Sequence, residues 1–294
     1  MSYLVGYSPY KDDRGAIDLA AQFARSEPAT VEAITVVPRG WGTPAAAGTD
    51  REFEQWAAAE GAAGAAEAAA LLADHADIES TTGWQPGRSV PPVLLERAAA
   101  AGASMVIVGS GENGPRGHVT VTSKTDRVLH SSDVPVAIAP RGYRAPAGSR
   151  ITRVTVGFRD DDPSWSLLER VADICRRVSA SLRIVTFAIR PRTMVSARVS
   201  IDDRLVFQQW KDQARAGLAE ASAHLASTGF DGALVETVLA EGRSWGGAID
   251  DVEWARGDVL VVGSSSTHRL GQVFLGSSAA KILRNSAVPV IVVP

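Results

Sequence analysis

Short apolar runs alternate with segments of helical spacing along the whole chain. The runs predict buried strands, and the same order of runs occurs in both halves. The predicted strands are residues 3–7, 31–37, 78–84, 105–108 and 134–139, then 154–158, 182–187, 234–239, 259–262 and 288–293. Helical spacing separates them, at residues 14–25, 50–73, 91–101, 164–178 and 202–227. This alternation predicts an α/β fold, with a parallel sheet covered by helices on both faces.

The end of the chain repeats an earlier stretch. Residues 263–294 align without a gap on residues 109–140, and 11 of the 32 positions are identical. Self-similarity on this scale indicates one structural unit that is present twice. We therefore expect two similar domains, residues 1–142 and 150–294, joined by a linker rich in Gly, Pro, Ala and Arg.

Composition narrows the class of protein. The net charge is −3 and no basic stripe appears, so the chain lacks the electrostatic footprint of a nucleic-acid binder. Cys175 is the only cysteine, which excludes an intramolecular disulfide and fits a reducing compartment. Glu60 and Glu67 interrupt the Ala-rich stretch 57–73, which predicts a soluble helix and no membrane span. We expect a cytoplasmic protein.

The loop after the second copy of the fourth strand is the main candidate site. Gly263 lets the backbone turn off the strand, and Gly276 and Ser277 open the next helix, whose free N–H groups favour an anion. Hydroxyl donors and one cation lie in the same segment: Ser264, Ser266, Ser277, Ser278 and Arg269. The alternative is a turn with a serine N-cap and no ligand.

These residues resemble the universal stress protein family. Its nucleotide-binding members carry G-2x-G-9x-G-(S/T) after the fourth strand, and Gly263, Gly276 and Ser277 match this motif, while Ser266 replaces the middle glycine. The Val-Pro-Val strands at 134–136 and 288–290 are also similar to those of the family.

The resemblance implies an adenine-nucleotide-alpha-hydrolase-like fold with the strand order 3-2-1-4-5 in each half. It also implies that the two last strands pair antiparallel and make an internal pseudo-dimer, and it leaves a homodimer of whole chains open. The implied ligand is ATP or a related adenine nucleotide, with or without Mg²⁺. Phe158 and Arg159 would line its base or ribose side.

The first half departs further from the family motif. Gly109 and Ser123 match the motif, Ser110 follows Gly109, and the strand end at Tyr7 and Ser8 resembles that of the family. These five residues form a weaker candidate site, because a carboxylate and a bulkier residue replace two motif glycines, at positions 112 and 122.

The Asp that ends the family's first strand is also missing. Its place falls on Ser8 in the first half and on Arg159 in the second. The acidic residues 160–162 follow Arg159 closely, and we favour a solvated acidic turn over a replacement for the missing Asp.

The sequence offers little chemistry beyond this. The pattern G-x-G-x-x-G at 109–114 follows the fourth strand rather than the first, so it is weak as a dinucleotide motif. The five histidines lack helical metal spacing, no nucleophile–base set appears, and Cys175 has the place of a packing residue in a helix. Five tryptophans lie in or near predicted helices and loops, and we assign them to core or inter-half packing rather than base stacking: Trp56, Trp165, Trp210, Trp245 and Trp254. Trp56 and Trp210 fall at matching places in the two long helices.

The expected function is therefore a stress-response protein that binds an adenine nucleotide in its second half as a regulatory or sensing ligand. Two alternatives remain. One is a nucleotide-free tandem scaffold that acts through protein partners, and the other is a slow ATPase.

Overall fold

The computed structural model describes residues 1–9, 14–40, 49–190, 202–264 and 275–294. The first half contains the strands β1 (Ser2–Tyr7), β2 (Thr30–Pro38), β3 (Ser80–Gly87), β4 (Met105–Gly109) and β5 (Val136–Ala139). Its helices are α1 (Gly15–Ser26), α2 (Thr49–Ala73), α3 (Val90–Ala100) and α4 (Ser123–Ser131).

The second half follows the same order of elements. Its strands are β6 (Arg153–Gly157), β7 (Ser181–Ile189), β8 (Val235–Gly242), β9 (Asp258–Gly263) and β10 (Val290–Val293). Its helices are α5 (Asp162–Val178), α6 (Asp202–Ser227), the 3-10 turn η1 (Gly232–Leu234), α7 (Trp245–Asp250) and α8 (Ser277–Asn285). The third strands differ most from the sequence prediction: β3 begins two residues later, and both run on to the glycine that precedes the next helix.

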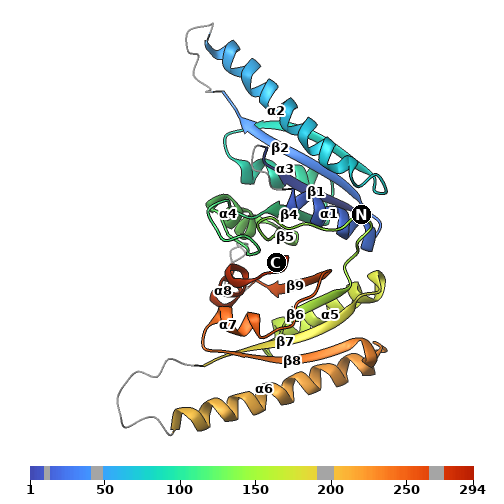
Figure 1. Cartoon of the computed structure of the whole chain (residues 1–294), viewed down its shortest axis with the longest axis vertical. Coiled ribbons are helices and arrows are strands. Elements are labelled where there is room, and N and C mark those ends of the chain that lie inside the picture. The colour runs from blue at the N-terminus through green and yellow to red at the C-terminus, as the bar shows by residue number, and fades with distance from the viewer. Residues whose placement is uncertain (10–13, 41–48, 191–201, 265–274) are drawn as a thin grey trace.

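In the described part of the chain, ten strands form one sheet in the order β3-β2-β1-β4-β5-β10-β9-β6-β7-β8. Within each half all pairs are parallel, and the order counted along that half is 3-2-1-4-5, as the family resemblance implies. Figure 1 shows the halves stacked along the long axis of the molecule, with α2 and α6 at its two ends.

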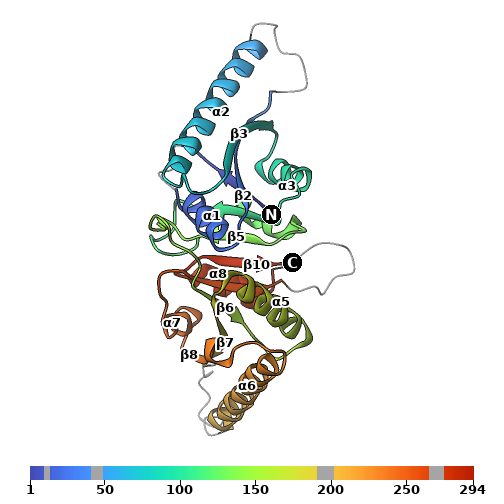
Figure 2. The same ribbon diagram turned by 90° about the vertical axis from the view of Figure 1, so that its right-hand side faces the viewer.

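The two halves meet through β5 and β10, which pair antiparallel at the middle of the molecule (Figure 2). Val290 lies opposite Ile138, Ile291 opposite Ala137 and Val292 opposite Val136. These side chains are almost all apolar and buried. The predicted internal pseudo-dimer is therefore confirmed, and each short apolar edge strand is covered by the other.

Each face of the joined sheet has its own hydrophobic core, and each core runs through both halves. One core lies under α1, α2, α5 and α6, and includes Ala137 and Ile291 from the central strands. The other lies under α3, α4, α7 and α8, and includes Ile138 and Val290. Alternate residues of β5 and β10 thus join the two halves on both faces of the sheet.

The linker between the halves is fixed to α1 by polar contacts. The Gln22 side chain donates to the Arg150 carbonyl at 3.0 Å and accepts from the Tyr143 hydroxyl at 2.5 Å. The Ser26 hydroxyl accepts from the N–H of Ile151 at 2.7 Å, and the Asp18 carboxylate accepts from the N–H of Ala145. Gln22, Ser26 and Asp18 are buried, so the linker supplies hydrogen-bond partners to a buried polar surface of α1.

The assignment of Trp56 and Trp210 to core or inter-half packing is wrong. Trp56 on α2 is 50 % exposed and Trp210 on α6 is 41 % exposed. Trp56 contacts Phe53, and Trp210 stacks on Phe207, each on its own helix. The two long helices lie at the two ends of the molecule, where Figure 1 shows no further element of the described chain covering their outer sides.

The seam between β5 and β10 yields a prediction about stability. Ile138 is fully buried beside its neighbours on β4 and β10. Because Ile138→Ala removes a buried side chain and leaves a cavity, the free energy of unfolding should fall by about 2–5 kcal/mol. Ile174→Ala on α5 is the matched control, since Ile174 is 39 % exposed and should cost less than about 1 kcal/mol. Urea unfolding measures both, and equal losses would contradict a packed seam.

Candidate functional site

The carboxyl ends of β1 and β4 border a cavity of about 150 Å³ in the first half. Tyr7, Ser8, Gly109 and Ser110 line it, so the structure brings together four of the five residues that the sequence predicted there. Ser123 is exposed at the start of α4, between the lining residues Thr122 and Lys124. The other walls are mostly apolar and come from Ile34, Val36, Val90, Leu94, Val108 and Val128.

The polar groups of this first cavity are largely committed to the protein itself. The Ser110 hydroxyl accepts from the N–H of Thr120 and lies near the carbonyls of His118 and Thr120. The Tyr7 hydroxyl donates to Glu67 on α2 at 2.6 Å. The Thr122 side chain caps α4 by accepting from the N–H of Thr125 at 3.1 Å. Apart from the exposed Lys124, few side-chain donors of the lining therefore remain for a phosphate group in the first half.

The start of α8 in the second half is arranged differently. Gly276 is its N-cap residue, and no side chain accepts a hydrogen bond from the first turn in the described part of the chain. Ser277 is exposed and Ser278 is half-buried. The first N–H groups of a helix lack intrahelical partners and lie at the positive end of the helix dipole, so this end of α8 can accept an anion.

Gly263 and Ser264 lie at the carboxyl end of β9, at the start of the same loop. A Cβ at Gly263 would meet Leu167 at 3.5 Å, an ordinary contact, so the position is not crowded. The N–H of Ser264 donates to the carbonyl of Val293 on β10 at 2.8 Å. That amide is therefore committed to the sheet. The predicted residues Ser266 and Arg269 lie outside the described residues.

Phe158 and Arg159 follow β6, where the resemblance places the base or ribose. The Phe158 ring is buried and packs edge-on against Trp165, with ring centroids 5.1 Å apart. Its ring therefore belongs to the core beneath α5. The Arg159 guanidinium is 69 % exposed and pairs with Asp161 at 2.5 Å.

The acidic turn after β6 serves as a helix cap. The Asp161 carboxylate accepts from the N–H of Ser164, and the Ser164 hydroxyl accepts from the N–H of Asp161, which is a capping box. Burial raises the pKa of the Asp161 carboxyl, but hydrogen bonds from Arg159 and Ser164 outweigh it and leave that pKa below its usual value. Asp160 accepts from the Trp165 indole at 3.0 Å. The turn interpretation of this segment agrees with these contacts.

Two aromatic residues that the sequence analysis did not select as site residues lie beside the second-half site. Phe187 occupies the place on β7 that Val36 has on β2, and Trp245 opens α7 as Val90 opens α3. Their rings contact each other, with centroids 6.2 Å apart and planes tilted by 51°. Both are half-buried, and the Lys281 ammonium lies 5.8 Å from the Trp245 ring. The sequence contained one signal for these positions. The Gly-Arg-Ser repeated at 87–89 and 242–244 aligns the two halves there and so shows which residues of the halves correspond.

Other chemistry is scarce in the described residues. They contain no group of three His, Cys, Asp or Glu side chains that could hold a metal ion. None of their helices is long and apolar enough to cross a membrane. Burial raises the pKa of the Cys175 thiol to about 12, which suits the packing role predicted for it.

The duplicated sheet and its topology define a tandem α/β protein, in which two parallel units are joined through their last strands. A model of the universal stress protein family matches residues 3–140 and again residues 150–294. Universal stress proteins of Mycobacterium tuberculosis and Mycobacterium bovis are each 36% identical over 299 residues, with 100% of both chains covered. This chain belongs to the universal stress protein family.

A solved structure shows the same fold. It is that of a universal stress protein from Archaeoglobus fulgidus, with a TM-score of 0.64 and 15% sequence identity. The match covers 99% of this chain and 97% of that one.

Buried Cys175 yields a prediction about thiol reactivity. Only the thiolate is nucleophilic, and a thiol with a pKa of about 12 is almost fully protonated near neutral pH. We expect the native protein to resist iodoacetamide at about pH 8, where an ordinary thiol reacts, and to take up one equivalent after unfolding in guanidinium. Mass spectrometry of the intact chain measures both. Rapid labelling of the native protein would show that α5 opens or that the thiol is accessible.

Proposed function

We propose that this chain is a cytoplasmic stress-response protein that binds ATP or a related adenine nucleotide in its second half, as a regulatory or sensing ligand. The observation that carries the proposal is the start of α8, where Gly276 leaves the first turn without a side-chain cap. At the matching place in the first half, Thr122 caps α4 with its own oxygen.

The phosphates would lie at the amino end of α8. There the amides of the first turn and the hydroxyls of Ser277 and Ser278 would donate to them, and the helix dipole would favour their charge. Gly263 would allow the chain to pass close to the ligand. Ser264 would contribute its hydroxyl alone, because its amide already bonds to β10.

The base would lie toward Phe187 and Trp245. Their half-buried rings offer flat apolar faces, where the first half offers the smaller side chains of Val36 and Val90. An adenine ring stacks readily on such faces. Lys281 adds a positive charge close to the Trp245 ring.

We expect little or no hydrolysis of the bound nucleotide. Among the described residues near α8, no His or carboxylate stands with a hydroxyl or thiol as a nucleophile–base pair. The binding of the ligand, rather than its turnover, would then carry the signal, with or without Mg²⁺.

A nucleotide-free scaffold is the second candidate, and one observation favours it. Trp56 and Trp210 expose large apolar surfaces at the two ends of the molecule, where a protein partner could bind them. A mass spectrum of freshly purified, denatured protein separates the candidates, because co-purified ATP, ADP or AMP argues against the scaffold.

The nucleotide proposal predicts that an Asp placed at the helix N-cap weakens ATP binding in the second half and has no effect in the first. Gly276→Asp places a carboxylate at the N-cap of α8, where it would accept the free amides and repel a phosphate. We expect the affinity for ATP to fall by at least about tenfold, while the melting temperature does not fall, because Asp is a good N-cap residue. Isothermal titration with ATP and Mg²⁺ measures the affinity.

Thr122→Asp is the matched control, since it places the same carboxylate at the N-cap of α4. The affinity for ATP should not change. No heat with any adenine nucleotide in the unsubstituted protein would remove the binding proposal, and a loss in Thr122→Asp alone would move the site to the first half. ATP turnover that survives Gly276→Asp would belong to another site or to a contaminant.

A further inference from the structure

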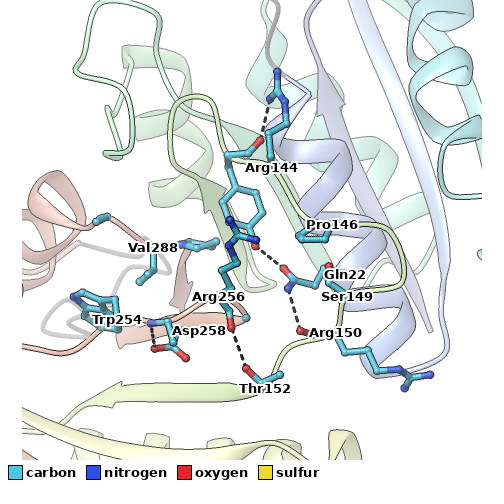
Figure 3. A pocket seen from close by; sticks show the side chains of 15 residues that line it. Gln22, Arg144, Pro146, Ser149, Arg150, Thr152, Trp254, Arg256, Asp258 and Val288 are labelled. Carbon is cyan, nitrogen blue, oxygen red and sulfur yellow. Dashed lines mark hydrogen bonds between the residues drawn. The ribbon is translucent and has the colours of Figure 1, made fainter.

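A larger cavity lies at the seam between the two halves. Its volume is about 450 Å³, within the roughly 300–1,000 Å³ of typical small-molecule pockets. Its walls come from α1, the linker and the residues next to the amino ends of β6, β9 and β10 (Figure 3). It therefore lies at the opposite end of the second-half strands from the start of α8, and is separate from the proposed nucleotide site.

The walls of this seam cavity are held in place by hydrogen bonds between distant segments. Gln22 on α1 binds both Tyr143 and Arg150 of the linker, as described above. The Thr152 hydroxyl donates to the carbonyl of Arg256 at 3.3 Å. Figure 3 shows these bonds around the cavity. A cavity whose walls are already ordered costs a ligand less to occupy.

The seam cavity carries an excess of positive charge. Three arginines line it, Arg144, Arg150 and Arg256, against the single carboxylate of Asp258. That carboxylate is neutralised by Arg153, whose Nη2 and Nε atoms lie 2.7 Å and 3.0 Å from its two oxygens.

The three lining arginines have no carboxylate of their own in the described part of the chain. Arg144 donates to the carbonyl of Tyr143 at 2.9 Å, and no ion pair is formed by any of the three. Figure 3 shows the Arg144 and Arg150 side chains pointing away from the cavity on opposite sides, whereas the exposed Arg256 side chain extends across it and can meet an anion there. The planar fork of an arginine suits a phosphate oxygen pair, to which it donates two parallel hydrogen bonds.

The rest of the cavity offers apolar surface and one unsatisfied polar atom. Trp254 and Pro289 line it, and the Trp254 indole is fixed by a 2.8 Å hydrogen bond to the carbonyl of Ile249. The hydroxyl oxygen of Ser149, another lining residue, is buried without a hydrogen-bond partner among the described residues. A native structure normally satisfies such an atom, and a bound ligand or an ordered water would do so.

We propose that the seam cavity binds a small organic phosphate. Arg256 and the Ser149 hydroxyl hold its phosphate group, and Trp254 and Pro289 contact its apolar part. Because the ligand touches residues of the linker and of the second half, its binding also stabilises the joined arrangement of the two halves.

The test is isothermal titration of the full chain with phenyl phosphate, with phenol and inorganic phosphate as the probes that lack one of its two parts. We expect phenyl phosphate to bind at one saturable site and more tightly than either partial probe. Arg256→Gln should weaken its binding about tenfold, because it removes a charge-assisted bond. Arg144→Gln with Arg150→Gln should weaken it less, since these side chains point away from the cavity. All three side chains are exposed, so the variants should melt like the unsubstituted protein.

Arg170→Gln is the control, since Arg170 is an exposed arginine on α5 that does not line the cavity. It should leave the affinity for phenyl phosphate unchanged. Equal weakening by all the substitutions would show general attraction of anions to the surface and would overturn the proposal. It would also be overturned if phenyl phosphate gave no heat, or if phenol bound as tightly as phenyl phosphate.

Discussion

The antiparallel pairing of β5 with β10 is the contact on which the rest of this structure depends. Each strand is only four residues long, and each would be an exposed apolar edge in an isolated half. Their pairing joins two five-stranded sheets into one and lets both hydrophobic cores continue across the centre. It also fixes where the linker runs, and the linker in turn makes one wall of the seam cavity.

Duplication of the fold has not kept the two halves chemically equal. The same loop and helix occur twice, but the polar side chains of the first copy form hydrogen bonds within that copy. The Ser110 hydroxyl accepts from the Thr120 N–H, and Thr122 caps α4. The second copy has a glycine in place of that cap. A single change from threonine to glycine thus decides whether the amides at a helix start are satisfied or left available. The halves have also diverged beside this site, where two rings replace two valines.

The two cavities differ in a way that follows from the sheet. Cavities at the carboxyl ends of strands belong to one half each, because each is built from the loops of one parallel unit. The seam cavity needs both halves, since its arginines come from the linker and from the loop before β9. The first kind of cavity needs a single parallel unit. The second kind arises from joining two units in one chain.

The sequence by itself determined the duplication, the order of strands and helices, and the glycine at the start of α8. These features are local or repeated, so residue spacing and self-similarity in the sequence are enough to reveal them. The family resemblance added the strand order and the central pairing. Tertiary structure alone decided which groups remain available. The Ser264 N–H donates to the Val293 carbonyl, and the Phe158 ring packs in the core, so neither is available to a ligand. Trp56 and Trp210 remain exposed. Each of these outcomes depends on whether segments far apart in the chain pack against the residue. No local sequence pattern encodes that packing.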